Sequence, residues 1–255
     1  GGGVVDRVKR RVDRETGTGG FVSFFRNNAT YAILLAMWVT FVAQWVALFV
    51  GGQSLHNTLF VLQSEAVTNV WTWVTSVFSH APGQLFHIIG NSVVILFFGP
   101  LVERYIGSRK FAALFVGAGA AAGLAHVLSH ELFASLGLFG TVGVTGVLGA
   151  SGAIFAVLGL LTVLNPHLRI YLYFIIPVPL WLFTIGFALL SVVFFVSPSA
   201  SSALGQGNVA HFAHLAGLVI GLAYGRRVKG RHRVPNKLSF GGRGGGGMNG
   251  PGRRF

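Results

Sequence analysis

A single serine, Ser151, stands among small residues in the stretch GVLGASGAIF, at the start of a long apolar run. A serine hydroxyl at such a position can cap a helix, fill a packing contact or act as a nucleophile. As a nucleophile it needs a neighbouring base to accept its proton, and histidine suits that task near neutral pH. The groups that lie opposite Ser151 therefore decide among the three roles.

Two other apolar stretches carry candidate partners for this serine. In FHIIGNSVV, His87 and Asn91 are four residues apart, and in NVAHFAHLAG, His211 and His214 are three apart, so each pair shares one face of a helix. A serine paired with a histidine can perform acyl transfer. The last aspartate of the chain is Asp13, far from these stretches, so we expect a Ser–His dyad rather than an acid-oriented triad.

Acyl transfer also requires hydrogen-bond donors for the oxyanion of the tetrahedral intermediate. His87 and Asn91 can supply them, together with backbone N–H groups around Ala150 and Ser151 at a helix N-terminus, where the helix dipole favours negative charge. Each polar residue taken singly could equally join helices by hydrogen bonds. Their joint occurrence in three separate apolar stretches favours a functional site.

The composition indicates what kind of elements position these residues. The chain is 53% hydrophobic and 10% charged, with a mean hydropathy of +0.68, whereas soluble domains carry about 25% charged residues. The chain has no cysteine, which excludes disulfides, thiolate metal sites and a cysteine nucleophile. Apolar runs of about 20 residues predict six membrane spans, at residues 31–50, 86–102, 111–133, 147–164, 171–196 and 209–224.

The distribution of positive charge predicts the orientation of these spans. All nineteen Lys and Arg residues lie before the first span or after the second, fourth and sixth, and the loops at 51–85, 134–146 and 197–208 contain none. The positive-inside rule then places both termini in the cytoplasm. The second, fourth and sixth spans run from outside to inside, so Ser151, His214, His87 and Asn91 all fall just below the outer surface.

Small residues repeat along the fourth and sixth spans. Such faces let two helix backbones approach closely, which a direct hydrogen bond between a serine and a histidine requires. The residues concerned are Gly152, Ala156 and Gly159 in the fourth span and Gly217, Gly221 and Gly225 in the sixth.

Four motifs in this order, HIIGN, GPLVERYIG, GASG and AHLAGLVIG, resemble those of the rhomboid intramembrane serine proteases. The resemblance covers about residues 31–224 and implies an all-α, six-transmembrane-helix rhomboid-like bundle. It implies Ser151 as the nucleophile, His214 as the general base, and His87 with Asn91 lining the oxyanion site. His214 rather than His211 matches the catalytic position, because Gly217 and Gly221 follow it at the motif's offsets; His211 is expected to be structural or to line a cavity.

The same resemblance implies cleavage of single-span membrane proteins near the outer face of the bilayer, without a cofactor or a metal. It implies substrate entry between the second and fifth helices, under the loop at 197–208. The chain departs from the family pattern at two places. Trp71-Thr72 stands where many members have Trp-Arg, and Phe155 stands where an aromatic residue, often tyrosine, packs on the histidine.

Three other functions compete with this interpretation. A zinc protease is disfavoured because HELFA begins like the His-Glu-x-x-His motif but ends in Ala134, which leaves His126 and His130 without an evident third ligand. A non-catalytic rhomboid-like protein that binds membrane clients remains the alternative, although such proteins usually lack the serine or the histidine. A transporter would need a buried carboxylate or an inverted repeat, and neither is evident.

The predicted organisation is a basic cytoplasmic leader at 1–30, the protease domain at 31–225 and a Gly- and Arg-rich cytoplasmic tail at 226–255. The composition of the tail predicts disorder. Because few aromatic residues accompany its charges, we expect it to anchor the topology on anionic lipid rather than to bind nucleic acid. The expected partners are transmembrane-helix substrates and the lipid bilayer, and the expected location is the cell membrane.

Overall fold

The computed structural model describes residues 24–137, 146–172, 175–197 and 210–230. The leader up to residue 23, the loop at 198–209 and the tail from residue 231 lie outside the described residues. The helices are α3 (Ala29–Phe60), α4 (Thr72–Phe78), α5 (Leu85–Ile106), α6 (Ser108–Ser135), α7 (Ser151–Leu164), α8 (Leu180–Val196) and α10 (His211–Lys229). The helical fold class predicted from the sequence is confirmed.

Four short strands form two antiparallel pairs. Strand β1 (Leu62–Gln63) pairs with β2 (Gly146–Val147), and β3 (Arg169–Leu172) pairs with β4 (Ile176–Pro179). The first pair ties the segment after α3 to the segment that enters α7, although more than eighty residues separate them in sequence. This pairing helps to position the residues that enter α7, where the site described below lies.

The described helices present an apolar surface that suits a bilayer. Three of them, α3, α5 and α6, are long and apolar enough to cross a membrane, while α7 and α8 are shorter apolar helices. Large apolar side chains are exposed on their outer faces, including Phe49 at 93% and Phe86 at 88%. Contiguous exposure of this kind is unusual on a soluble protein and typical of contact with lipid.

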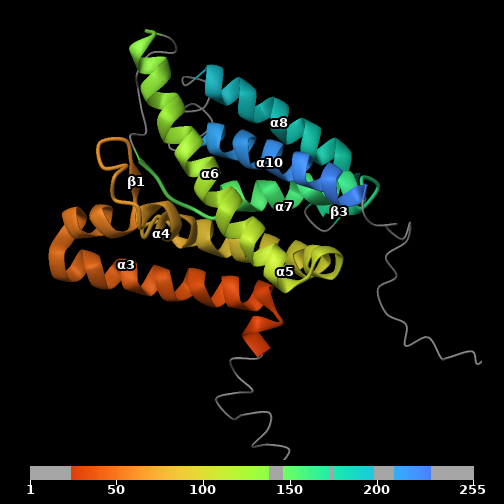
Figure 1. Cartoon of the computed structure of the whole chain (residues 1–255), viewed down its shortest axis with the longest axis horizontal. Coiled ribbons are helices and arrows are strands. Elements are labelled where there is room, and N and C mark those ends of the chain that lie inside the picture. The colour runs from red at the N-terminus through yellow and green to blue at the C-terminus, as the bar shows by residue number, and fades with distance from the viewer. Residues whose placement is uncertain (1–23, 138–145, 173–174, 198–209, 231–255) are drawn as a thin grey trace, which may run out of the picture.

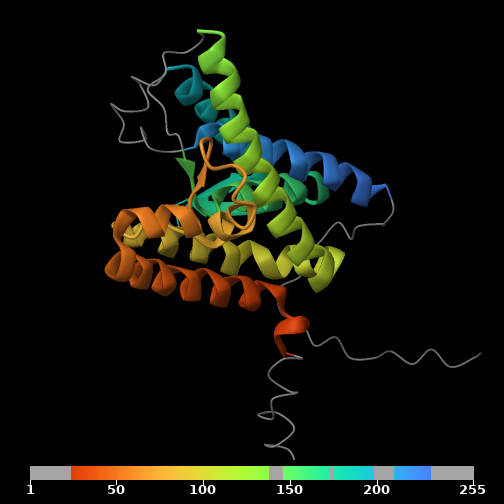
Figure 2. The ribbon, with the colours of Figure 1, turned by 60° about the vertical axis from the view of Figure 1, so that its left-hand side comes forward.

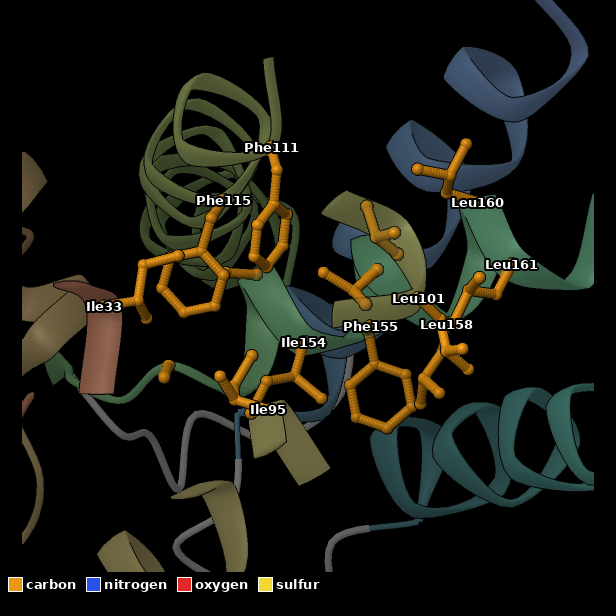
Figure 3. Close-up of a cluster of buried hydrophobic side chains, with 14 of the residues drawn as sticks. Ile33, Ile95, Leu101, Phe111, Phe115, Ile154, Phe155, Leu158, Leu160 and Leu161 are labelled. Atoms are coloured by element: carbon orange, nitrogen blue, oxygen red, sulfur yellow. The ribbon is translucent and has the colours of Figure 1, made fainter. Parts of the chain in front are cut away.

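Helix α7 runs through the middle of the bundle, with α5, α6, α8 and α10 packed around it (Figures 1 and 2). Its residues from Gly152 to Leu161 are all buried. Phe111 and Phe115 of α6, Ile33 of α3 and Ile95 of α5 meet Ile154 of α7 in the apolar core (Figure 3). The first residue of α7, Ser151, is therefore positioned by the most deeply buried of the described helices.

One carboxylate joins the start of α3 to the end of α5. The backbone N–H of Ala29, the backbone N–H of Thr30 and the Thr30 hydroxyl all donate to Glu103. The N-terminal N–H groups of a helix have no partner within the helix and favour an anion. Glu103 supplies that cap from a neighbouring helix, and Gly99, one turn earlier, leaves room for Thr30.

The basic residues gather at one end of the molecule. The last turn of α5, the first turn of α6, β3 and the last turn of α10 lie toward the same end, at the right in Figure 1. These segments carry Arg104, Arg109, Lys110, Arg169, Arg226, Arg227 and Lys229. The arrangement agrees with the orientation predicted from the loops.

Two of the predicted spans begin earlier than the helices observed. The fourth span was expected from Val147, but Val147 belongs to β2 and α7 begins at Ser151. The fifth was expected from Tyr171, but residues 169–179 contain the β3–β4 hairpin and α8 begins at Leu180. Proline lacks an amide hydrogen and restrains the residue before it to extended conformations, so Pro177 and Pro179 favour a strand over helix.

Helices α3 and α10 both continue beyond their predicted ends. Helix α3 runs past residue 50 to Phe60, through a kink at Gly52, whose φ of 63° and ψ of −161° are not helical. Helix α10 ends at Lys229 rather than at Tyr224, because its last turn extends into the basic segment. Basic side chains near a helix C-terminus interact favourably with the dipole.

Candidate active site

Ser151 is the first residue of α7 and is half-buried. The chain reaches it from β2 through Gly149, whose φ of +128° is rarely adopted by residues with a side chain. The Gly149 N–H donates to the carbonyl oxygen of Ser76 in α4 at 2.8 Å. Strand β2, the glycine turn and α4 together fix where the serine side chain begins.

His214 of α10 lies opposite this serine. Its Nε2 is 2.8 Å from Ser151 Oγ, although the two residues are 63 apart in sequence. The short distance is possible because the two helices touch through their backbones. A Cβ atom at Gly217 would lie 2.0 Å from the Gly152 carbonyl oxygen, and one at Gly221 would lie 2.0 Å from the Ala156 carbonyl oxygen. The predicted small-residue faces therefore meet.

Aromatic rings, rather than an acid, surround the His214 imidazole. Its Nδ1 has no hydrogen-bond partner within the part of the chain that the structure describes. The Phe155 ring stacks on it with centroids 4.6 Å apart and planes at 28°, and Phe187 of α8 lies 6.0 Å away. His214 is only 7% exposed. Packing thus restrains the ring so that its Nε2 faces the serine.

His87 of α5 lies on the other side of the turn that leads into α7. A Cβ atom built on Gly149 would be 3.2 Å from His87 Cε1, 3.4 Å from His87 Nε2 and 3.7 Å from Ser151 Oγ. Ala150, which precedes the serine, is fully buried. The structure therefore brings His87, Ser151 and the first backbone N–H groups of α7 together around one glycine.

Asn91 lies one helical turn after His87, and its side chain contacts a histidine outside the predicted site residues. Its Nδ2 is 2.9 Å from Nε2 of His80, a fully buried histidine between α4 and α5. The rings of His80 and His87 are 5.0 Å apart. Helical spacing cannot reveal His80, because it lies in a loop; its only sequence signal is a histidine seven residues before His87.

The other candidate histidines are separate from the Ser151–His214 pair. His211 packs on Phe194 with ring centroids 5.1 Å apart, and its ring is 6.0 Å from that of His214. His126 is buried in α6. Among the described residues no group of three or more His, Cys, Asp or Glu is arranged to hold a metal ion.

A cavity of about 10 Å³ adjoins Ser151, which is about the space that one water molecule needs. Ser76, Ser151 and the turn that leads into α7 line it, together with small residues of α6 and α10. The lining residues are Ser76, Val77, Gly119, Gly123, Val147, Leu148, Gly149, Ser151, Gly152 and Ala213.

Comparison with known families matches the Rhomboid domain to residues 67–231, which is well over half of the chain. This chain belongs to the rhomboid family. Trp71 and Thr72, the predicted counterparts of the family's Trp-Arg pair, both use their side chains in local hydrogen bonds. The Trp71 indole N–H donates to the Thr58 carbonyl oxygen at 2.8 Å, and the Thr72 hydroxyl donates to the Asn69 carbonyl oxygen at 2.7 Å.

Two rhomboid relatives are similar over most of this chain. RHOMBOID-like protein 12, mitochondrial, of Arabidopsis thaliana is 28% identical over 211 residues, which are 78% of this chain and 56% of that protein. Rhomboid protein 1, mitochondrial, of Saccharomyces cerevisiae is 33% identical over 166 residues, which are 65% of this chain and 44% of that protein. The chain thus spans about half the length of the curated relatives it matches.

Proposed function

We propose that this rhomboid is an intramembrane serine endopeptidase in which Ser151 is the nucleophile and His214 the general base. The observation that carries the proposal is the 2.8 Å contact between Ser151 Oγ and His214 Nε2 within an apolar bundle. A polar pair in such surroundings is costly to maintain and indicates function. Its two members come from different helices, and the glycine contacts between those helices bring the two side chains close together.

In the proposed reaction Ser151 Oγ attacks the carbonyl carbon of the scissile peptide bond while His214 Nε2 accepts the hydroxyl proton. The C–N bond then breaks, and His214 returns the proton to the leaving amine, which leaves an acyl-enzyme. A water molecule activated by the same imidazole hydrolyses the ester and restores the serine. The small cavity beside Ser151 offers a place from which that water can attack.

The oxyanion of the tetrahedral intermediates needs donors on the side of Ser151 away from His214. We assign this role to His87, to Asn91 and to the backbone N–H groups at Ala150 and Ser151. The position of His87 against Gly149 supports the assignment, as does the start of α7 at Ser151, where the helix dipole stabilises negative charge. Loss of one such donor reduces turnover about 10²–10³-fold.

The proposed substrate is a single-span membrane protein cut near the outer face of the bilayer. A peptide bond inside a helix is protected by the helix's own hydrogen bonds, so a segment with Gly or Pro near its outer end is the preferred target. Entry between α5 and α8 fits the exposed apolar side chains on both helices, such as Phe97 and Leu189. Of the loop at 197–208, expected above this entrance, residues 198–208 lie outside the described residues.

The cell membrane is the proposed location, with both termini on the cytoplasmic side. The basic end of the bundle supports the orientation, but it does not distinguish one membrane from another. Both relatives are named as mitochondrial. Fractionation with plasma-membrane and mitochondrial markers tests the location, and enrichment with the mitochondrial marker would replace the cell membrane in this proposal.

The decisive experiment is cleavage of a single-span reporter in proteoliposomes, together with labelling by a fluorophosphonate probe. We expect Ser151→Ala to lose both cleavage and labelling, and His214→Ala to lose at least 10³-fold in rate. Ser129→Ala, which removes a hydroxyl on α6, and His167→Ala, which removes an exposed imidazole, serve as matched controls. Equal labelling of wild type and Ser151→Ala would support a non-catalytic client-binding protein instead.

A further inference from the structure

Hydrogen bonds through the buried residues Gln44 and His80 connect α3 to Asn91. We propose that Gln44 and His80 are positioning residues that hold the Asn91 amide with a hydrogen directed at the oxyanion. The inference rests on the proposed function, because it deepens the role of Asn91 in the same site. Gln44 and His56 lie outside the region that the Rhomboid domain matches, which begins at residue 67.

The orientation of Gln44 follows from its partners. The backbone N–H of His80 can only donate, and it lies 2.9 Å from Gln44 Oε1. The Gln44 amide nitrogen therefore faces the other way, where it is 2.9 Å from Nε2 of His56. The Gln44 nitrogen donates there, so His56 Nε2 accepts. Both ends of this fully buried amide are satisfied, and its hydrogen bond fixes the backbone of His80.

The tautomer of His80 follows in the same way. Its Nδ1 is 3.1 Å from the carbonyl oxygen of Phe78, which can only accept, so Nδ1 carries the hydrogen. Nε2 is then an acceptor, and the group 2.9 Å away must be the donating nitrogen of Asn91. Burial, with the neighbouring His87 ring adding to it, lowers the pKa of His80 to about 3. The imidazole therefore stays neutral and keeps this acceptor.

The consequence for Asn91 is a defined amide orientation. An asparagine side chain can rotate to exchange its oxygen and nitrogen at little cost unless a neighbour distinguishes them. His80 accepts one hydrogen of the Asn91 NH₂ group and leaves the second free to donate. Without His80 the amide can present its oxygen to the site, where it would repel a developing oxyanion rather than stabilise it.

The proposal predicts that His80→Phe acts through Asn91. We expect His80→Phe and Asn91→Ala each to lower kcat by up to about 10²–10³-fold with little change in KM, because an oxyanion donor acts mainly in the transition state. The double variant His80→Phe/Asn91→Ala should be no slower than Asn91→Ala alone. His80→Gln, which retains an acceptor oxygen, should recover part of the rate, and Gln44→Leu should show a smaller loss of the same kind.

Ser92→Ala is the matched control, because Ser92 forms another polar contact between α3 and α5. Its Oγ accepts a hydrogen bond from the Trp38 indole N–H at 3.1 Å. Ser92 is the residue after Asn91, but it takes no part in the hydrogen bonds that link Gln44, His80 and Asn91. We expect Ser92→Ala to lower thermal stability as much as Gln44→Leu does while leaving kcat unchanged. Similar losses of kcat in both variants would indicate a merely structural role for Gln44.

The rate measurement uses full-length protein in proteoliposomes with the single-span reporter. If the fold-changes of His80→Phe and Asn91→Ala multiply in the double variant while cleavage still depends on Ser151, the positioning role is overturned and the protease function stands. Wild type that does not cleave, and labels no better than Ser151→Ala, overturns both. Nitrogen-15 NMR of labelled histidine adds an independent readout: Asn91→Ala should shift the His80 Nε2 resonance, whereas Ser92→Ala should not.

Discussion

At the residue scale, the distinctive feature is a histidine oriented by packing. In acid-oriented triads a carboxylate holds the imidazole by a hydrogen bond to Nδ1. Here the described residues provide no such partner for His214 Nδ1, and the ring lies against Phe155 and Phe187 instead. Ring stacking restrains the plane of the imidazole without adding a charge to an apolar interior.

We predict that Phe155→Leu lowers kcat about 10²-fold, because a small displacement of His214 from Ser151 is sufficient for such a loss. Phe155→Tyr, which keeps the ring, should remain close to wild type. The measurement is the rate of fluorophosphonate labelling and reporter cleavage by folded protein in proteoliposomes.

Phe111→Leu is the control for this prediction, since Phe111 is also a buried phenylalanine of the core but belongs to α6 and contacts Phe115. It should lower stability without a comparable loss of rate per folded molecule. Equal losses of rate in the two variants would show that general destabilisation, and not the stacking on His214, explains the effect.

At the element scale, the contact between α7 and α10 determines whether the serine and histidine can meet. A Cβ at Gly217 or Gly221 would overlap a backbone carbonyl oxygen of α7, at 2.0 Å in both cases. Backbone cannot move aside as a flexible side chain can, so the two helices would have to separate. The distance between Ser151 and His214 would increase with them.

We predict that Gly221→Ala destabilises the protein by at least about 1–3 kcal/mol and reduces cleavage, although residue 221 lies two turns from His214. Thermal unfolding in detergent, followed together with probe labelling, checks both effects. Gly90→Ala in α5 is the matched control, because a Cβ there meets nothing within 4 Å. It should be neutral or stabilise by about 0.4–1 kcal/mol; a similar loss in both variants would contradict the packing argument.

The boundaries of the helices and strands show which features the sequence pattern predicts and which depend on tertiary context. Among the described residues, apolar runs located the helices α3, α5, α6, α7, α8 and α10, since a membrane span needs a continuous apolar stretch. The same runs could not reveal that residues 171–179 leave the helix for the β3–β4 hairpin, because strand and helix in an apolar run have similar composition. The kink at Gly52 was likewise hidden, because glycine is tolerated within membrane helices.

At the scale of the whole molecule, the orientation of the bundle determines on which side of the membrane the site lies. The chain contains no cysteine, so each engineered cysteine is a unique reporter. Thr68 lies between β1 and α4, at the predicted outer face, and His167 lies between α7 and β3, at the basic end; both are exposed.

We predict that a membrane-impermeant maleimide labels Thr68→Cys in intact cells, and that it labels His167→Cys only after the membrane is permeabilised. This result follows if the basic end remains in the cytoplasm. Cysteine-free wild type controls for background. Labelling of His167→Cys in intact cells with protection of Thr68→Cys would reverse the topology and place Ser151 near the opposite face.

The sequence by itself determined the membrane class, the places of the helices, the orientation expected from charge and the residues that could perform acyl transfer. These features depend on composition, on periodicity and on motifs that are local in the chain. Only the tertiary structure decided that Ser151 Oγ and His214 Nε2 lie 2.8 Å apart and that Phe155 stacks on the imidazole. It likewise decided that the His80 ring contacts Asn91 while the His80 backbone N–H donates to Gln44. Those contacts join segments far apart in sequence, and their distances depend on how closely helix backbones approach, which no local pattern specifies.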